Sequence, residues 1–149
     1  MPTDAQWLSL CCCTESNRPH EWPFVAWTIR RRVEANRVMF GGNTYQGVIL
    51  KPMQFSAFNG VLGTPDQVYS IVSAEQDAAS RTLAEHCAAW VLGTPTQNGP
   101  ISALSFYYFS PISMVPAGKL PAWDWNKLRR FSVSQVDPYR FIFAEEIRA

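Results

Sequence analysis

Apolar residues near the N-terminus recur at the spacing of one face of an α-helix. Their separations of one, three and four residues are typical of a helix that packs one side against a core. Thr3 or Asp4 is a suitable N-cap, and Asn17-Arg18-Pro19 predicts the helix end, because a proline disfavours helical backbone in the residue before it. The face consists of Trp7, Leu8, Cys11, Cys12 and Glu15.

Two further helical segments are predicted. Pro23 suits a first helical turn, so the second helix is expected from about Pro23 to about Asn36. Residues 64–67, Thr-Pro-Asp-Gln, have the pattern of a capping box and predict a long helix that ends at Gly93, with a break near Asp77. The positions expected to be buried are Trp22, Val25, Ile29 and Val33 in the second helix and Leu83, Cys87, Trp90 and Val91 in the long one.

The segment from Val38 to Gly63 is divided by glycine, proline and asparagine into short pieces. Its apolar runs at 45–50 and 53–58 predict loops with a small β-hairpin or sheet. Further along, 101–109 and 139–143 are expected as strands, and 123–130 is expected to hold a short helix. The pattern predicts an α+β fold, mostly helical with a small antiparallel β region, in a single domain that covers residues 1–149.

Composition and charge exclude several classes of protein. Apolar residues make up 47% of the chain and aromatic residues 13%, as in a globular protein. The net charge of +1 gives no general basic field, so nucleic acid is not an expected partner, and Arg30-Arg31-Arg32 fits a solvated helix face. No stretch approaches the ~18–20 apolar residues of a membrane span, and the N-terminus does not resemble a secretion signal.

The cysteines do not have the spacing of a metal site. Cys11, Cys12 and Cys13 are adjacent on the expected helix and point in different directions, so neither a metal nor another cofactor is expected. Small buried apolar residues in a reducing compartment explain them better. A thiol pair of Cys13 with His20 is a weaker hypothesis, and so is a serine nucleophile in the proline-rich loop, because no histidine lies near it in sequence.

The stretches Val25–Val33 and Thr44–Gly60 resemble the cell wall hydrolase family typified by the spore-cortex-lytic enzymes. The similarity depends mainly on Val48-Ile49 followed by Gln54-Phe55-Ser56. Residues Gly99–Pro111 are similar to the Gly-Ala…Tyr segment of that family. The resemblance implies a lysozyme-like fold and cleavage of the glycan strands of peptidoglycan, which would then be the partner of this chain.

Glu15 lies where that family has its catalytic glutamate, at the end of the first helix. Glu15-Ser16 also resembles the Glu-Ser start used by goose-type lysozymes and lytic transglycosylases. A general acid must keep its proton near neutral pH. We expect burial beside Leu8 and Cys11, together with the negative end of the helix dipole, to favour the protonated carboxyl of Glu15.

A second carboxylate for the reaction is not evident in the sequence. No Asp or Glu occurs between Glu34 and Asp66, whereas a mechanism with two carboxylates needs them ~5–9.5 Å apart. A lytic transglycosylase needs one acid only, because the 6-hydroxyl of the sugar attacks and gives a 1,6-anhydro product. This reaction on the MurNAc-GlcNAc strand is therefore preferred over lysozyme-type hydrolysis.

Polar and aromatic side chains are available to hold a glycan. Amide and hydroxyl groups suit N-acetyl groups and sugar hydroxyls, and aromatic rings offer flat faces, with core packing as the alternative for each ring. Because side chains alternate along a strand, one tyrosine of the pair at 107 and 108 should point away from the cleft, and Tyr108 is expected to face it. The predicted substrate-binding residues are Gln54, Phe55, Ser56, Asn59, Tyr107, Tyr108 and Trp123.

The sequence fits a phage-type endolysin, a monomer made in the host cytoplasm that acts in the periplasm and cell wall after release. A secretion-system or tail-associated effector fits equally. The alternative from another class is a catalytically inactive glycan-binding or virion structural module on the same fold. Two departures support it: Arg31-Arg32 stand where the family has Asn-Arg, and 137–143, DPYRFIF, lacks the histidine expected near the C-terminal Phe-Tyr.

Overall fold

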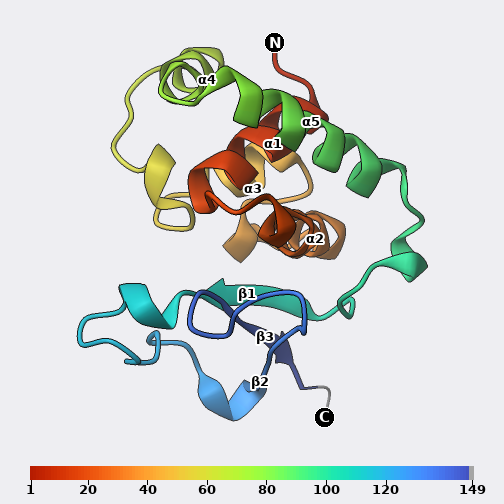
Figure 1. The fold of residues 1–149 in the computed structure, drawn as a ribbon, viewed down its shortest axis with the longest axis vertical. Coiled ribbons are helices and arrows are strands. Elements are labelled where there is room, and N and C mark those ends of the chain that lie inside the picture. The colour runs from red at the N-terminus through yellow and green to blue at the C-terminus, as the bar shows by residue number, and fades with distance from the viewer. Residues whose placement is uncertain (148–149) are drawn as a thin grey trace. The chain divides into compact units, whose positions relative to one another are not determined.

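The computed structural model describes residues 1–147 of the chain. The chain forms two compact units, which are Met1–Pro100 and the segment from Ile101 onward. The first unit is helical and the second contains a small sheet (Figure 1). The prediction of an α+β fold with a small antiparallel β region is confirmed. The prediction that residues 1–149 act as one domain stays a prediction, because two compact units can work together or separately.

The first unit is built around its first helix. Helix α1 packs against α5, α2, α3 and α4, and Figure 1 shows these helices gathered around it. Short 3₁₀ turns, among them Pro19–Glu21 and Ser56–Phe58, connect some of them. The helices are α1 (Asp4–Glu15), α2 (Trp22–Ala35), α3 (Tyr45–Ile49), α4 (Pro65–Ala74) and α5 (Ala78–Gly93).

Helix α1 begins and ends as the sequence predicts. Thr3 is the N-cap and forms a capping box with Gln6, in which each side chain accepts a hydrogen bond from the backbone N–H of the other residue. Residues 7–12 are all buried, so the helix is covered on every side and not on one face only. A helix in this position needs apolar or small side chains all round, which explains why Cys11 and Cys12 stand in a continuous run.

The buried side of α5 differs from the prediction. Ala84, Ala88 and Val91 are fully buried, whereas Leu83 is 50% and Trp90 is 62% exposed. Short side chains let two helices approach closely, so α5 packs its alanine side against α1 and turns its larger residues outward. The helix itself was predicted well, since it ends at Gly93 and a break capped by Asp77 separates it from α4.

The prediction of a small β-hairpin or sheet between Val38 and Gly63 is wrong. Helix α3 occupies part of this segment, capped by Thr44, whose hydroxyl accepts a hydrogen bond from the Gly47 N–H at 2.9 Å. Gly47 also allows a close backbone contact, because a Cβ atom there would lie 2.5 Å from the Gly41 carbonyl oxygen. These glycines therefore serve helix packing and not strand turns, and a single bridge between Arg37 and Gly42 is the only β-pairing in this described segment.

The second unit contains a three-stranded antiparallel sheet with the order β1-β3-β2 (Figure 1). Strand β3 lies at the centre and pairs Phe143 with Tyr108 on one side and with Phe131 on the other. The sequence located β1 well, but it put the last strand about three residues too early and missed β2, which follows a 3₁₀ turn at Trp125–Lys127 instead of a helix. The strands are β1 (Ser105–Phe109), β2 (Leu128–Phe131) and β3 (Ile142–Glu146).

No helix among the described residues is both long enough and apolar enough to span a bilayer.

Replacing Leu8 by alanine tests how far the first unit depends on the burial of α1. Leu8 is 0% exposed, so Leu8→Ala should lower the free energy of unfolding by about 2–5 kcal/mol through lost contacts and the cavity that remains. Leu62 is 86% exposed, and Leu62→Ala should change that free energy by less than about 0.5 kcal/mol. Urea denaturation followed by circular dichroism measures both, and equal effects of the two variants would contradict the central position of α1.

Candidate functional site

Glu15 is the last residue of α1, as predicted, and its side chain is half-buried. One turn earlier on the same helix, the Cys11 thiol is fully buried. Burial raises the pKa of Cys11 well above its ordinary value, and the negative charge of Glu15, one turn further along α1, raises it further. The carboxyl group of Glu15 thus sits at the boundary between the core of the unit and its surface.

The residue after Glu15 is held by hydrogen bonds on each of its polar groups. The Ser16 N–H donates to the Cys12 carbonyl at 3.1 Å, and the Ser16 carbonyl accepts from the indole N–H of Trp22 at 2.9 Å. The Ser16 hydroxyl donates to the carboxylate of Glu21 at 2.5 Å and accepts from the Arg18 N–H at 3.0 Å. Because Glu21 is fully buried, this network fixes the backbone where α1 ends and therefore the start of the Glu15 side chain.

The arginine run is not a solvated helix face, and that prediction is wrong. Arg31 is 4% and Arg32 is 9% exposed. The guanidinium carbons of Arg30 and Arg31 lie 4.6 and 4.7 Å from the ring centroid of Trp27. Arg30 donates to the Val91 and Thr94 carbonyls, and Arg31 donates to Glu34 and Thr96. Stacking on an aromatic ring and bonding to carbonyls allow these cations to be buried.

Arg32 connects α2 to the segment that contains the Gln-Phe-Ser block. Its Nη1 donates to the Gln54 Oε1 at 2.7 Å, and its guanidinium lies over the rings of Phe40 and Phe55. Gln54 in turn donates from Nε2 to the carbonyls of Phe40 at 3.0 Å and Val48 at 2.7 Å. The side-chain amide of Gln54 is thus engaged inside the unit, and a sugar would have to compete with these three hydrogen bonds.

The other predicted residues of this segment differ in exposure. Phe55 is buried at 3% exposure and packs beside Arg32. Ser56 and Asn59 are exposed, and the Asn59 Oδ1 accepts a hydrogen bond from the Met53 N–H at 3.0 Å. Of the four residues, Ser56 and Asn59 are therefore the ones whose polar groups face solvent.

The buried thiol of Cys11 is influenced by charges from both α1 and α2. Its pKa is influenced by the negative charge of Glu15 and, in the opposite direction, by the positive charge of Arg32. Arg32 lies in the last turn of α2 and joins this helix to Gln54. We call Glu15, Arg32 and Gln54 of the first unit the Glu15 site.

The predicted aromatic platform lies in the second unit. Tyr107 contacts Trp123 with ring centroids 4.9 Å apart, and Tyr108 contacts Phe141 at 5.4 Å. Adjacent positions on β1 place the two tyrosines on opposite faces of the sheet, as the alternation of side chains predicts. The hypothesis that Tyr107, Tyr108 and Trp123 bind the same ligand as Glu15 stays a prediction.

The alternative nucleophiles gain no support from their surroundings. The charges that influence the Cys13 thiol come from Arg81, Asp77 and Glu85, and His20 is exposed. Among the described residues, no group of His, Cys, Asp or Glu could hold a metal ion. Ser110 and Ser113 bond to each other at 3.2 Å in the loop after β1.

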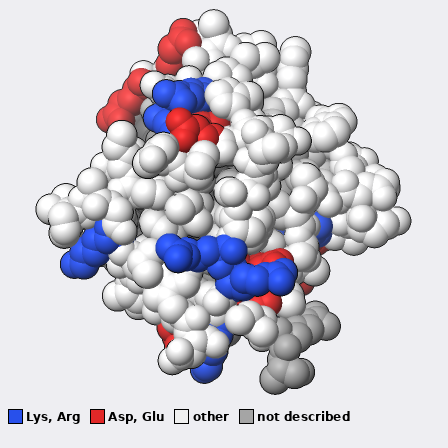
Figure 2. Space-filling view, turned by 60° about the horizontal axis from the view of Figure 1, so that its bottom comes forward, with Lys and Arg blue, Asp and Glu red and all other residues white. Residues whose placement is uncertain are grey.

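The surface charge is mixed. Figure 2 shows one face of the molecule, where much of the surface is uncharged and basic groups lie near acidic ones. This pattern agrees with the net charge of +1.

No protein-family model matches the chain, and comparisons with curated proteins and with solved structures give no match either.

The hydrogen bonds of Gln54 are testable. Gln54→Ala should lower the free energy of unfolding by about 1–3 kcal/mol, because the Phe40 and Val48 carbonyls and the Arg32 guanidinium each lose a partner. Ser56→Ala removes an exposed hydroxyl two residues away and should change it by less than about 0.5 kcal/mol. Thermal and urea unfolding measure both, and a silent Gln54→Ala variant would refute the structural role of this amide.

The four thiols should differ in reactivity. Burial raises the pKa of Cys87 to about 11 and also raises the pKa of Cys13, so both remain protonated near neutral pH and their thiolates form only in alkali. Alkylation by iodoacetamide, located by peptide mass spectrometry, should be slow at both residues and accelerate with pH. Cys11 and Cys12 should react only after unfolding, and labelling in denaturant is the control. Rapid labelling of Cys12 in the folded protein would contradict the burial of α1.

Proposed function

We propose that the chain is a peptidoglycan-cleaving glycosidase on a lysozyme-like fold, with Glu15 as its general acid and base. The observation that carries the proposal is the position of Glu15, at a fixed helix end, half-buried beside the buried thiol of Cys11. Partial burial is the environment in which a carboxyl group can exchange a proton with a substrate near neutral pH. The proposed partner is the MurNAc-GlcNAc glycan strand.

The proposed reaction is that of a lytic transglycosylase. Glu15 gives its proton to the glycosidic oxygen as the bond between that oxygen and C1 of MurNAc breaks. The 6-hydroxyl oxygen of the same sugar then bonds to C1, and its proton returns to the Glu15 carboxylate, so that a 1,6-anhydro ring forms without water. The absence of Asp and Glu between Glu34 and Asp66 supports a mechanism with one carboxyl group.

The second candidate function is an inactive glycan-binding or virion structural module. It is favoured by the bond between Arg32 and Gln54 and by the two hydrogen bonds that the Gln54 amide donates to backbone carbonyls inside the unit. In that case the chain would have the fold of a glycosidase, but Glu15 would not catalyse a reaction.

The substitution Glu15→Gln tests the proposed function. It should reduce the clearing of outer-membrane-stripped Gram-negative cells by roughly 10²–10⁴-fold, the usual contribution of a general acid. Glu75→Gln changes an exposed glutamate of the same unit and should leave the clearing rate unaltered. Both variants should unfold at the wild-type temperature. Equal clearing by Glu15→Gln and wild type would show that Glu15 is not the catalytic residue. If the wild type binds peptidoglycan without clearing the cells, the inactive module is favoured.

The masses of the released muropeptides decide between the two reactions. Products that end in 1,6-anhydro-MurNAc weigh one water less than hydrolysis products and would support the transglycosylase. Products with reducing ends alone would refute it and leave a lysozyme-type hydrolase.

A further inference from the structure

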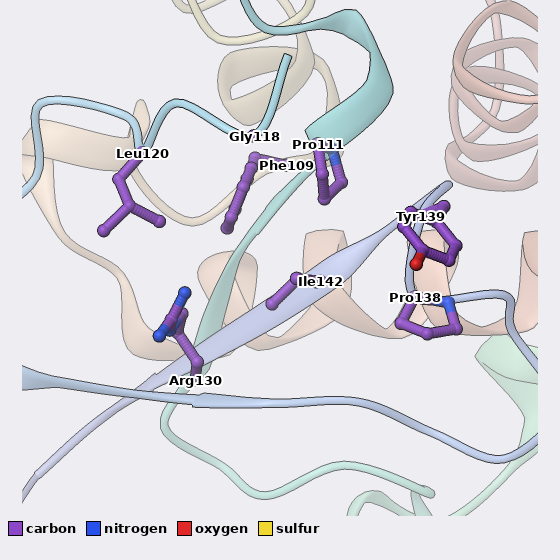
Figure 3. A pocket seen from close by; sticks show the side chains of 8 residues that line it. All are labelled: Phe109, Pro111, Gly118, Leu120, Arg130, Pro138, Tyr139 and Ile142. Atoms are coloured by element: carbon purple, nitrogen blue, oxygen red, sulfur yellow. The ribbon is translucent and has the colours of Figure 1, made fainter.

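The second unit contains a pocket that the proposed function does not use. It has a volume of about 310 Å³ and lies on one face of the sheet (Figure 3). Its floor is formed by Phe109 of β1 and Ile142 of β3, which pair directly across the two strands. Its lining residues are Phe109, Pro111, Gly118, Leu120, Arg130, Pro138, Tyr139 and Ile142.

Backbone hydrogen bonds hold the walls of this pocket in place. The Gly118 N–H donates to the Pro111 carbonyl at 2.9 Å and closes the loop between them. The Ile112 N–H donates to the Tyr139 carbonyl at 3.2 Å and ties this loop to the segment before β3. Because sheet and loop are joined in this way, the pocket is preformed. Binding of a ligand would therefore cost little conformational entropy.

Arg130 is the one charged residue that lines the pocket. It projects from β2, and Figure 3 shows Arg130 and Tyr139 at opposite ends, with Ile142 between them. Its guanidinium lies 5.9 Å from the ring centroid of Trp125, and among the described residues no carboxylate lies within ion-pair distance of it. Asp137 is the nearest acid in sequence to the far wall, and its Oδ1 accepts from the Tyr139 N–H at 2.9 Å. The Arg130 end of the pocket is therefore positive.

The neighbouring arginine provides a contrast. Arg129 lies on the opposite face of β2, where its guanidinium forms an ion pair with Glu145 of β3. The Ser102 hydroxyl and Arg129 together lower the pKa of Glu145. One arginine of the pair is thus neutralised within the sheet, while the other presents its charge at the edge of an apolar pocket.

We propose that this pocket binds a carboxylate joined to an apolar group. The guanidinium of Arg130 would hold the carboxylate by charge-assisted hydrogen bonds, and the side chains of Phe109, Leu120 and Ile142 would surround the apolar part. Such a group occurs both in free apolar acids and at the carboxyl end of a peptide with an apolar last residue. The inference does not depend on the proposed function, because all eight lining residues belong to the second unit.

Titration of the full chain with 4-phenylbutanoate, followed by two-dimensional NMR, tests the pocket. The resonances of Leu120, Arg130 and Ile142 should shift with a roughly millimolar dissociation constant, as expected of so small a ligand. The neutral 4-phenylbutanamide should bind at least about tenfold more weakly, because it lacks the charge. A second titration uses the peptide N-acetyl-glycyl-phenylalanine, with its terminal carboxyl either free or amidated. Tighter binding of its free acid than of phenylbutanoate identifies a peptide end, and the reverse identifies a free acid.

Two substitutions separate a bound carboxylate from unspecific adsorption. Arg130→Gln should weaken binding of phenylbutanoate by roughly tenfold or more, whereas Arg129→Gln, the matched control on the other face, should leave the affinity unchanged. Leu120→Glu places a negative charge in the lining of the pocket and should also weaken binding of phenylbutanoate. Glu15→Gln should bind like wild type, so that failure of the enzymatic proposal leaves this one standing. Equal binding of acid and amide, or unchanged affinity in Arg130→Gln, would overturn the proposal.

Discussion

The burial of α1 on all sides is the constraint on which the first unit depends. A central helix must be covered by its neighbours, and α5 meets it with Ala84 and Ala88, the smallest side chains it has. The run of cysteines follows from the same requirement, since small apolar side chains can face any direction inside a core. The helix leaves the core at both ends, with Asp4 exposed at its start and Glu15 half-buried at its C-terminal end. Glu15 stands at that point, so its half-buried position is a consequence of how the core is built.

Arg31 and Arg32, two adjacent residues of α2, are buried inside the first unit. Arg31 and Arg32 stack on aromatic rings and bond to oxygen atoms, which removes much of the cost of burying a cation. Arg31 and Arg32 thus have structural roles at the positions where the resemblance led us to expect Asn-Arg. Gln54 also has a structural task, because its amide joins Arg32 to two backbone carbonyls. The Gln54-Phe55-Ser56 segment thus supports the fold of the first unit through the side chain of Gln54.

In the second unit, two adjacent residues of the same type have different surroundings because they lie on opposite faces of the sheet. Arg129 and Arg130 are adjacent in sequence, but alternation along β2 directs them to opposite faces. One meets Glu145 and the other meets Trp125 and an apolar pocket. Tyr107 and Tyr108 are separated in the same way, each with its own aromatic partners. Residues that share a face of this sheet therefore share their surroundings, whereas adjacent residues of a strand do not.

Local signals in the sequence determined helices α1, α2, α4 and α5, whereas α3 was missed. The N-cap near Thr3, the stop at Asn17-Arg18-Pro19, the proline at position 23, the capping box at Thr64 and the stop at Gly93 act through neighbouring backbone groups, and so they could be read without a fold. The position of Glu15 at a helix end followed from them. Only the tertiary structure decided which side of α5 is buried, that glycines 41 and 47 pack a helix instead of turning a strand, and that the arginines are inside. It also decided that a pocket forms around Arg130. Each of these depends on contacts between residues far apart in the chain, whose energies no local pattern of the sequence records.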